Sequence, residues 1–223
     1  MINNHHLSKK QEEIISYLIA KTDCNHRSLP SIKQMSLDLK ISTANLREHI
    51  AFLKTIGVLE AKPRNGIRLL DYQLTPALAK SLFFAVKLDK DVFNKYSDIR
   101  NHLEKSFFIE ASKCLTSRDN EQLKLLVTRA KEKLLRDPIQ IPHQEHREFH
   151  LQIYRPLNNI FLIGMLEAYW DTYEMIGLDV YADLSYLKKV WDYHQMILER
   201  LADRDYQAGY ELLIDHMELI FSR

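Results

Sequence analysis

The sequence contains few of the residues that build disulfide-rich or turn-rich proteins. Among its 223 residues are two Cys, five Gly and six Pro. Two Cys are too few for a disulfide scaffold or a thiolate zinc site, and so little Gly and Pro disfavours an all-β fold. No apolar run approaches the roughly 18 residues of a membrane helix, and the opening MINNHHLSKKQEE lacks the apolar core of a signal peptide. We therefore expect a cytoplasmic protein that does not bind membranes.

The net charge is only +1, but it is unevenly distributed. Residues 1–70 hold 11 Lys or Arg against 6 Asp or Glu, whereas residues 71–223 hold 20 against 24. The first part therefore carries +5 and the second −4, which suggests that the first part binds a polyanion. Charge alone does not decide this, because an excess of this size is common on protein surfaces.

Helix-capping signals divide the first 70 residues into three short helices. Three serines stand at N-cap positions, each just before a stretch of helical apolar periodicity: Ser8, Ser31 and Ser42. The third helix has a buried stripe: Leu46, Ile50 and Leu53. That stripe turns polar residues outward: Thr43, Asn45, Arg47, His49 and Lys54. Such a tight helix pair is typical of a helix-turn-helix, whose second helix can lie in the major groove of DNA.

A basic hairpin follows these helices. Residues 58–62 and 67–69 are predicted strands around Pro63-Arg64-Asn65-Gly66, and Asn-Gly is a preferred hairpin turn. Arg64 and Arg68 give this wing its charge. The alternative is a three-helix unit with a surface hairpin and no partner.

The segment LPSIKQMSLDLKISTANLREHIAFLKTIGVLEAKPRNGIRL resembles the winged helix-turn-helix of the GntR family of bacterial transcription regulators. This resemblance implies a double-stranded DNA operator as partner, contacted at the positions of Lys33, Thr43 and Arg47. Thr43 departs from the cation usual in the family, so the operator should differ from the family's usual sequence. The full predicted contact set comprises the two caps, the helix faces and the wing: Ser31, Lys33, Ser42, Thr43, Asn45, Arg47, Arg64, Asn65 and Gly66.

Helical periodicity dominates the rest of the chain after a predicted linker at 71–75. The expected helices lie near residues 76–88, 91–115, 119–136, 143–156, 159–176, 184–202 and 205–221. Nothing here alternates as a strand does. The sequence therefore predicts a mainly α protein, with a winged helix-turn-helix over residues 1–70 and an all-α antiparallel bundle over 76–223. The interior of such a bundle commonly holds metals or small molecules.

Four histidines fall on apolar faces of three of these helices. His146 and His150 are four residues apart, so both project from one face, and His194 and His216 lie within apolar stripes of the last two helices. Four buried imidazoles are costly unless they share hydrogen bonds or a cation. From the residues alone, ordinary core histidines remain the alternative to a metal site.

Three segments resemble the FCD domain that follows the winged helix in the FadR-type branch of the GntR family. They are Asp98-Ile99-Arg100 with Leu103-Glu104, His146-Arg147-Glu148-Phe149-His150 with Asn158-Asn159, and the late pair His194 and His216. The resemblance implies a metal site made of four side chains: His146, His150, His194 and His216. His146 stands where the family has Asp.

The resemblance also implies the chemistry of the bound species. Imidazole in place of a carboxylate shifts the expected metal from manganese or magnesium toward zinc, with nickel second. Alternatively His146 is no ligand, and three histidines leave open positions for water or an effector. A small carboxylate effector is expected, held by Arg100 and Asn159. For Arg100, an internal salt bridge to Glu104 or Asp98 is the alternative.

The function implied by both resemblances is that of a homodimeric transcription regulator, most simply a repressor, and not an enzyme. Two alternatives remain open at this point. One is a metal-dependent hydrolase built on the bundle, disfavoured because no general base is well placed and Glu148 lies off the histidine face. The other is a metal-free sensor with structural histidines.

Overall fold

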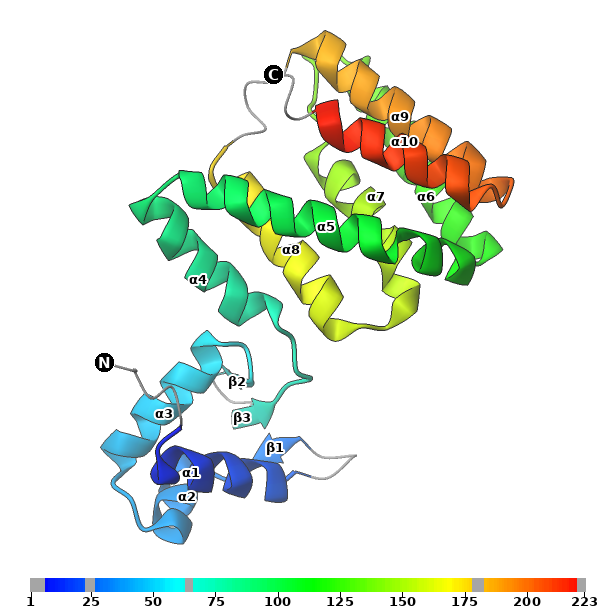
Figure 1. The fold of residues 1–223 in the computed structure, drawn as a ribbon. Coiled ribbons are helices and arrows are strands. Elements are labelled where there is room, and N and C mark those ends of the chain that lie inside the picture. Colours follow the sequence, from blue (N-terminus) through cyan, green and yellow to red (C-terminus); the bar gives the residue numbers. More distant parts are fainter. Residues whose placement is uncertain (1–6, 23–26, 63–65, 178–182, 220–223) are drawn as a thin grey trace. The chain divides into compact units, whose positions relative to one another are not determined.

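The chain divides into two compact units, residues 1–77 and 78–223 (Figure 1). The computed structural model describes residues 7–22, 27–62, 66–177 and 183–219. The division falls just after the predicted linker, and helix α4 (Thr75–Leu88) begins before it and continues into the second unit.

The first unit contains the three predicted helices and a small sheet. Its helices are α1 (Lys9–Ala20), α2 (Ile32–Leu39) and α3 (Thr43–Thr55). Each begins at its predicted cap, because the hydroxyls of Ser8, Ser31 and Ser42 each accept the amide hydrogen of the residue three positions later. The helices pack over one buried cluster: Ile14, Leu18, Met35, Ile41, Leu46, Ile50, Leu53, Leu59 and Ile67.

The sheet is antiparallel with strand order β1-β3-β2. Its strands are β1 (Ser28–Leu29), β2 (Leu59–Lys62) and β3 (Gly66–Leu69). The register pairs Glu60 with Arg68 and Ala61 with Ile67, and the Ile67 side chain is buried in the core. Strand β1 was not predicted, because two residues are too few to show an alternating pattern. The predicted turn residues Arg64 and Asn65 lie outside the described residues.

The second unit is the predicted helical bundle. After α4 come α5 (Asp91–Cys114), α6 (Ser117–Leu134), α7 (His143–Tyr154), α8 (Ile160–Met175), α9 (Leu184–Ala202) and α10 (Tyr206–Glu218). Helix α6 begins earlier than predicted, since Thr116 and Asp119 form a capping box. Helix α7 ends earlier, in a 3₁₀ turn over Arg155–Leu157 that contains Pro156.

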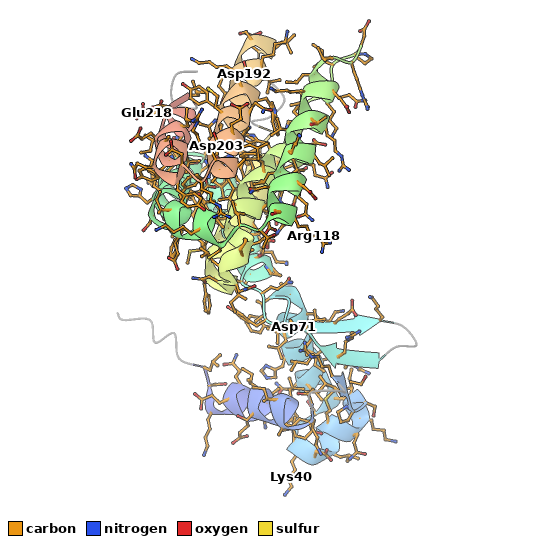
Figure 2. The ribbon with its side chains drawn as sticks, turned by 90° about the vertical axis from the view of Figure 1, so that its right-hand side faces the viewer. Lys40, Asp71, Arg118, Asp192, Asp203 and Glu218 are labelled. Atoms are coloured by element: carbon orange, nitrogen blue, oxygen red, sulfur yellow. The ribbon has the colours of Figure 1, made fainter. Side chains whose placement is uncertain are left out.

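Helix α7 lies at the centre of the bundle and contacts α5, α6 and α8, while α10 packs on α9 and α5 (Figure 1). This arrangement brings residues from α5, α7, α9 and α10 into one interior. Charged side chains such as Arg118 and Asp192 lie on the bundle surface (Figure 2). Within the described ranges, no helix is long and apolar enough to cross a membrane.

Candidate functional site

The bundle brings all four predicted histidines together. His146 and His150 come from α7, His194 from α9 and His216 from α10, and one ligand nitrogen of each lies within 4.8 Å of the others. The Nε2 atom of His150 is 3.3 Å from Nε2 of His194 and 3.3 Å from Nε2 of His216. These three side chains are buried, whereas His146 is partly exposed.

A carboxylate fixes the orientation of His150. Its Nδ1 atom lies 3.0 Å from Oε2 of Glu104 and 2.9 Å from Nη2 of Arg100. These two contacts require different tautomers, because a guanidinium can only donate: a protonated Nδ1 donates to Glu104, and an unprotonated Nδ1 accepts from Arg100. With the proton on Nδ1, the lone pair of Nε2 faces the other histidines, which is the tautomer that a metal ligand requires here. A carboxylate on the far nitrogen is a common second partner of metal-bound imidazole, and Glu104 is placed for that role.

Arg100 and Glu104 form a fully buried ion pair next to His150. Arg100 Nε donates to Glu104 Oε1 over 2.7 Å, and the guanidinium lies 5.1 Å from the ring centre of Tyr169 and 5.4 Å from that of Trp170. Burial raises the pKa of Glu104, and the Arg100 charge opposes that rise. The internal salt bridge weighed for Arg100 is thus present, and its role as an effector anchor stays a prediction.

The four imidazoles are held in the neutral form. Burial lowers the pKa of His146, His150, His194 and His216 well below the usual value, and nearby cationic groups, each other's included, lower it further. Nε2 of His146 and Nδ1 of both His194 and His216 are buried without a hydrogen-bond partner among the described residues. Converging neutral imidazoles with unused nitrogens fit a divalent ion that accepts nitrogen ligands, such as zinc.

The metal-free protein should therefore be sensitive to acid. The folded-state pKa values lie below that of an unfolded histidine, so the unfolded chain binds more protons as the pH falls below about 6.5. Each neutral histidine then costs up to about 1.4 kcal/mol of stability per pH unit. We expect the melting temperature of chelator-treated protein to fall between pH 7.5 and pH 5.5. A doubly substituted His146→Phe, His194→Phe variant should show a shallower fall, and an equal fall would contradict neutral burial.

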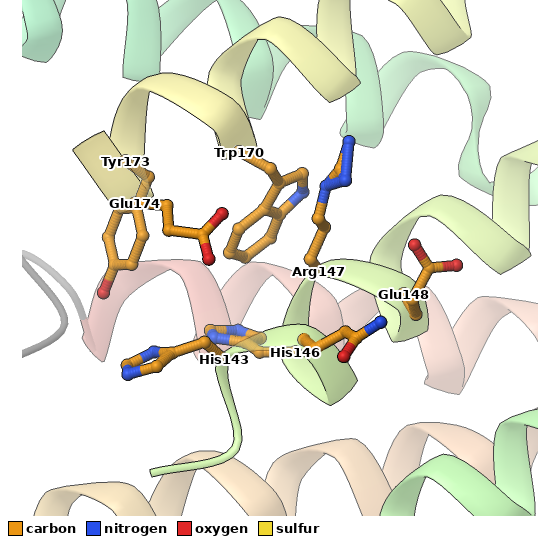
Figure 3. Close-up of a pocket in the computed structure, with 8 residues that line it drawn as sticks. His143, His146, Arg147, Glu148, Trp170, Tyr173 and Glu174 are labelled. Carbon is orange, nitrogen blue, oxygen red and sulfur yellow. The ribbon is translucent and has the colours of Figure 1, made fainter.

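A cavity of about 230 Å³ opens beside His146, between the amino-terminal half of α7 and the carboxy-terminal half of α8 (Figure 3). Its lining is mostly polar or aromatic: His143, Gln144, His146, Arg147, Glu148, Trp170, Tyr173 and Glu174. The ring centres of His146 and Trp170 are 4.7 Å apart with the rings edge to face. His143 is half-buried in this lining.

The carboxylates nearest the cluster on α7 are already engaged by cations. Glu145 pairs with Lys133 at 2.7 Å, and Glu148 pairs with Arg155 at 2.7 Å. Asn159 caps α8, where its side-chain oxygen accepts from the amides of residues 161 and 162 at 3.1 Å each. Its predicted effector contact stays a prediction.

The predicted DNA-contacting residues that the structure describes lie at the surface of the first unit. Thr43, Asn45 and Arg47 are exposed on α3, and Lys33 is exposed on α2. The hydroxyls of Ser31 and Ser42 cap α2 and α3, and both residues remain exposed. Gly66 has a φ of +71°, which accounts for glycine at that end of β3. Each described member thus lies at an exposed position on α2, on α3 or at the beginning of β3, and contact of these residues with DNA stays a prediction.

Comparison with known families decides the identity of the larger unit. The family model of the FCD domain matches residues 96–219, more than half of the chain. The chain belongs to the FCD domain family. The match covers α5 to α10 almost completely and includes all four histidines of the cluster together with Arg100 and Glu104.

Solved structures extend the likeness of this FCD protein to its full length. GntR of Streptococcus agalactiae gives a TM-score of 0.65 at 15% identity and covers 95% of this chain and 97% of its own. McbR/YncC of E. coli gives 0.53 at 16% identity and covers 97% of both chains. The predicted GntR-type fold with an FCD domain is confirmed, and the FadR branch stays a prediction. No curated protein sequence matches the FCD chain.

Proposed function

We propose that this FCD protein is a cytoplasmic, homodimeric transcription regulator that binds a short palindromic operator and represses transcription. The observation that carries the proposal is the exposed polar face of α3. The opposite face of this helix is the buried apolar stripe, and the residues at its amino end are exposed, as a helix that enters a major groove requires. Two copies would place two such helices one turn of DNA apart.

The bundle would control this binding through a divalent metal, with zinc as the leading candidate, and a small carboxylate effector. Four neutral imidazoles supply nitrogen ligands, Glu104 orients His150, and a cavity reaches His146. When bound, the ion would supply a positive charge that attracts the acid. A change in the bundle alters the spacing of the two α3 helices, and operator affinity falls because half-site spacing is fixed.

Regulation accounts for the site better than metal-dependent hydrolysis. A hydrolase needs a carboxylate or another base free to take a proton from metal-bound water. Glu104 is committed to Arg100 and His150, and Glu145 and Glu148 are paired with cations. Glu174 is a further carboxylate of the cavity lining, but it comes from α8, whereas the four histidines come from α7, α9 and α10. We propose no enzymatic activity for the chain.

Substitution Arg47→Ala should weaken specific DNA binding by about 1–3 kcal/mol, because its exposed guanidinium would lose contacts with base edges. Fluorescence anisotropy with a labelled fragment from the promoter of its own gene measures this. Lys10→Ala on α1 removes the same charge outside the predicted interface and serves as the control. Equal affinities for Arg47→Ala and the control would show that α3 is not the reading helix.

Lys33→Ala should act differently, through a phosphate contact at the start of α2. Such a change weakens binding to all DNA sequences alike and reduces the slope of log affinity against log salt by about one. A salt titration of the same anisotropy assay separates it from Arg47→Ala. An unchanged slope would remove Lys33 from the interface.

A further inference from the structure

The outward side of α3 carries an acidic residue that is not among the predicted DNA contacts. Leu46, Ile50 and Leu53 hold one side of this helix in the core. Successive residues of an α-helix are about 100° apart, so Glu48 lies almost directly opposite the middle of that buried stripe. The structure leaves Glu48 exposed there. A DNA groove that received this side of α3 would therefore meet Glu48.

Small residues flank Glu48 along the outward side of the helix. Ala44 precedes it by four residues and Ala51 follows it by three, so the three side chains lie in one row on the helix surface. All three are exposed. A methyl group on either side neither covers the Glu48 carboxylate nor holds the helix away from a bound duplex. Glu48 is therefore the side chain of this row that extends farthest from the helix.

The Glu48 carboxylate has no structural partner. Within the described ranges, no cation forms an ion pair with it and its side chain takes part in no hydrogen bond. Other carboxylates of the first unit are engaged, since Asp38 accepts from the Tyr17 hydroxyl over 2.6 Å and Glu60 pairs with Lys62 at 2.7 Å. An unpaired carboxylate on a helix that approaches DNA is repelled by the phosphates unless it finds a donor on the bases.

The major-groove edge of cytosine is the one that suits a carboxylate best. Cytosine presents an amino donor there, guanine presents two acceptors, thymine presents an acceptor and a methyl group, and adenine presents a donor beside an acceptor. An ionised carboxylate can accept but cannot donate, so guanine and thymine repel it and adenine suits it only in part. Because its charge also repels phosphates, such a residue adds more to discrimination between sequences than to affinity.

We propose that Glu48 is a specificity-determining residue that accepts a hydrogen bond from the amino group of a cytosine in each half-site of the operator. This inference rests on the proposed function, since it requires α3 to enter a major groove, and it names a base that the operator must contain. Arg47 lies about 100° round the helix from Glu48 and is left to contact a different base or a phosphate.

Selection from a randomised duplex DNA library tests this assignment. The full-length wild type, Glu48→Ala and Glu48→Gln each select bound duplexes, which are then sequenced. We expect the wild type to enrich a palindrome with C at one fixed position of each half-site. Glu48→Ala should enrich the same palindrome, with the preference for C at that position reduced at least about fivefold. Glu48→Gln should enrich A there as well, because an amide can pair with N6 and N7 of adenine.

Glu13→Ala is the matched control for these variants. Glu13 is also an exposed carboxylate of the first unit, but it lies on α1, outside the predicted contact set. Its loss should leave the selected sequences as in the wild type. An unchanged preference for C in Glu48→Ala would overturn the proposal, as would a loss of that preference shared with Glu13→Ala. Absence of A from the sites selected by Glu48→Gln would contradict a direct contact.

The same selection separates this inference from the proposed function. A wild-type protein that enriches no sequence would overturn both. If the wild type enriches a palindrome that contains no fixed C, or that Glu48→Ala selects with unchanged base frequencies, the reading of cytosine by Glu48 is wrong and sequence-specific DNA binding stands.

Discussion

His150→Ala is expected to abolish tight metal binding by the full chain. The Nε2 atom of His150 is the one that lies 3.3 Å from both His194 and His216, so its loss removes the central ligand. It also leaves Glu104 with no imidazole to orient. Removal of an orienting partner alone costs roughly 10–100-fold in metal affinity, so loss of the ligand itself should exceed about 100-fold. Competition with a chromophoric zinc chelator measures this affinity.

An exposed histidine outside the cluster, His102, provides the control for this prediction. His102 is exposed on α5, where Nδ1 lies 2.7 Å from the backbone oxygen of Asp98. His102→Ala should bind zinc as the wild type does. Comparable zinc affinity in His150→Ala and His102→Ala would mean that the cluster is a structural feature of the core.

Glu104→Ala should strongly destabilise the bundle. It leaves the Arg100 charge buried without its carboxylate, and breaking a buried pair in this way typically costs about 3–5 kcal/mol. It also frees Nδ1 of His150, so metal affinity should fall together with stability. Urea denaturation followed by far-ultraviolet circular dichroism measures the change in the free energy of unfolding.

Glu148→Ala tests whether this cost comes from burial. Glu148 pairs with Arg155 at the same 2.7 Å, but both side chains are partly exposed, so its loss should cost no more than about 1 kcal/mol. Similar losses for the two variants would contradict a special role for the Arg100–Glu104 pair. The double variant Arg100→Met, Glu104→Met should recover much of the stability, because it removes both charges at once.

Local signals predicted most of the fold. The hydroxyls of Ser8, Ser31 and Ser42 and the stripe Leu46, Ile50 and Leu53 act within one or two helical turns, and the structure has each where it was expected. Strand β1 was not predicted, because its two residues gain their partners only from β3, far along the chain.

In the site, too, the contacts between residues far apart in the sequence were the ones that could not be predicted. The presence of the four histidines on inward faces could be predicted from periodicity and resemblance, and the structure brings them together. The contact of His150 with Glu104, 46 residues away, could not, because it depends on how α5 and α7 pack. The Arg100–Glu104 ion pair is different, because it joins residues four apart on α5, and the sequence already offered it as an alternative.

The central claim is that the imidazoles of α7, α9 and α10 form a metal centre. Elemental analysis by mass spectrometry of protein produced without a histidine tag, and dialysed against metal-free buffer, tests it directly. The account predicts one transition-metal ion per chain in the wild type, zinc foremost, and none in His150→Ala. Metal-free wild-type protein that neither takes up zinc nor melts at a higher temperature when zinc is added would contradict it.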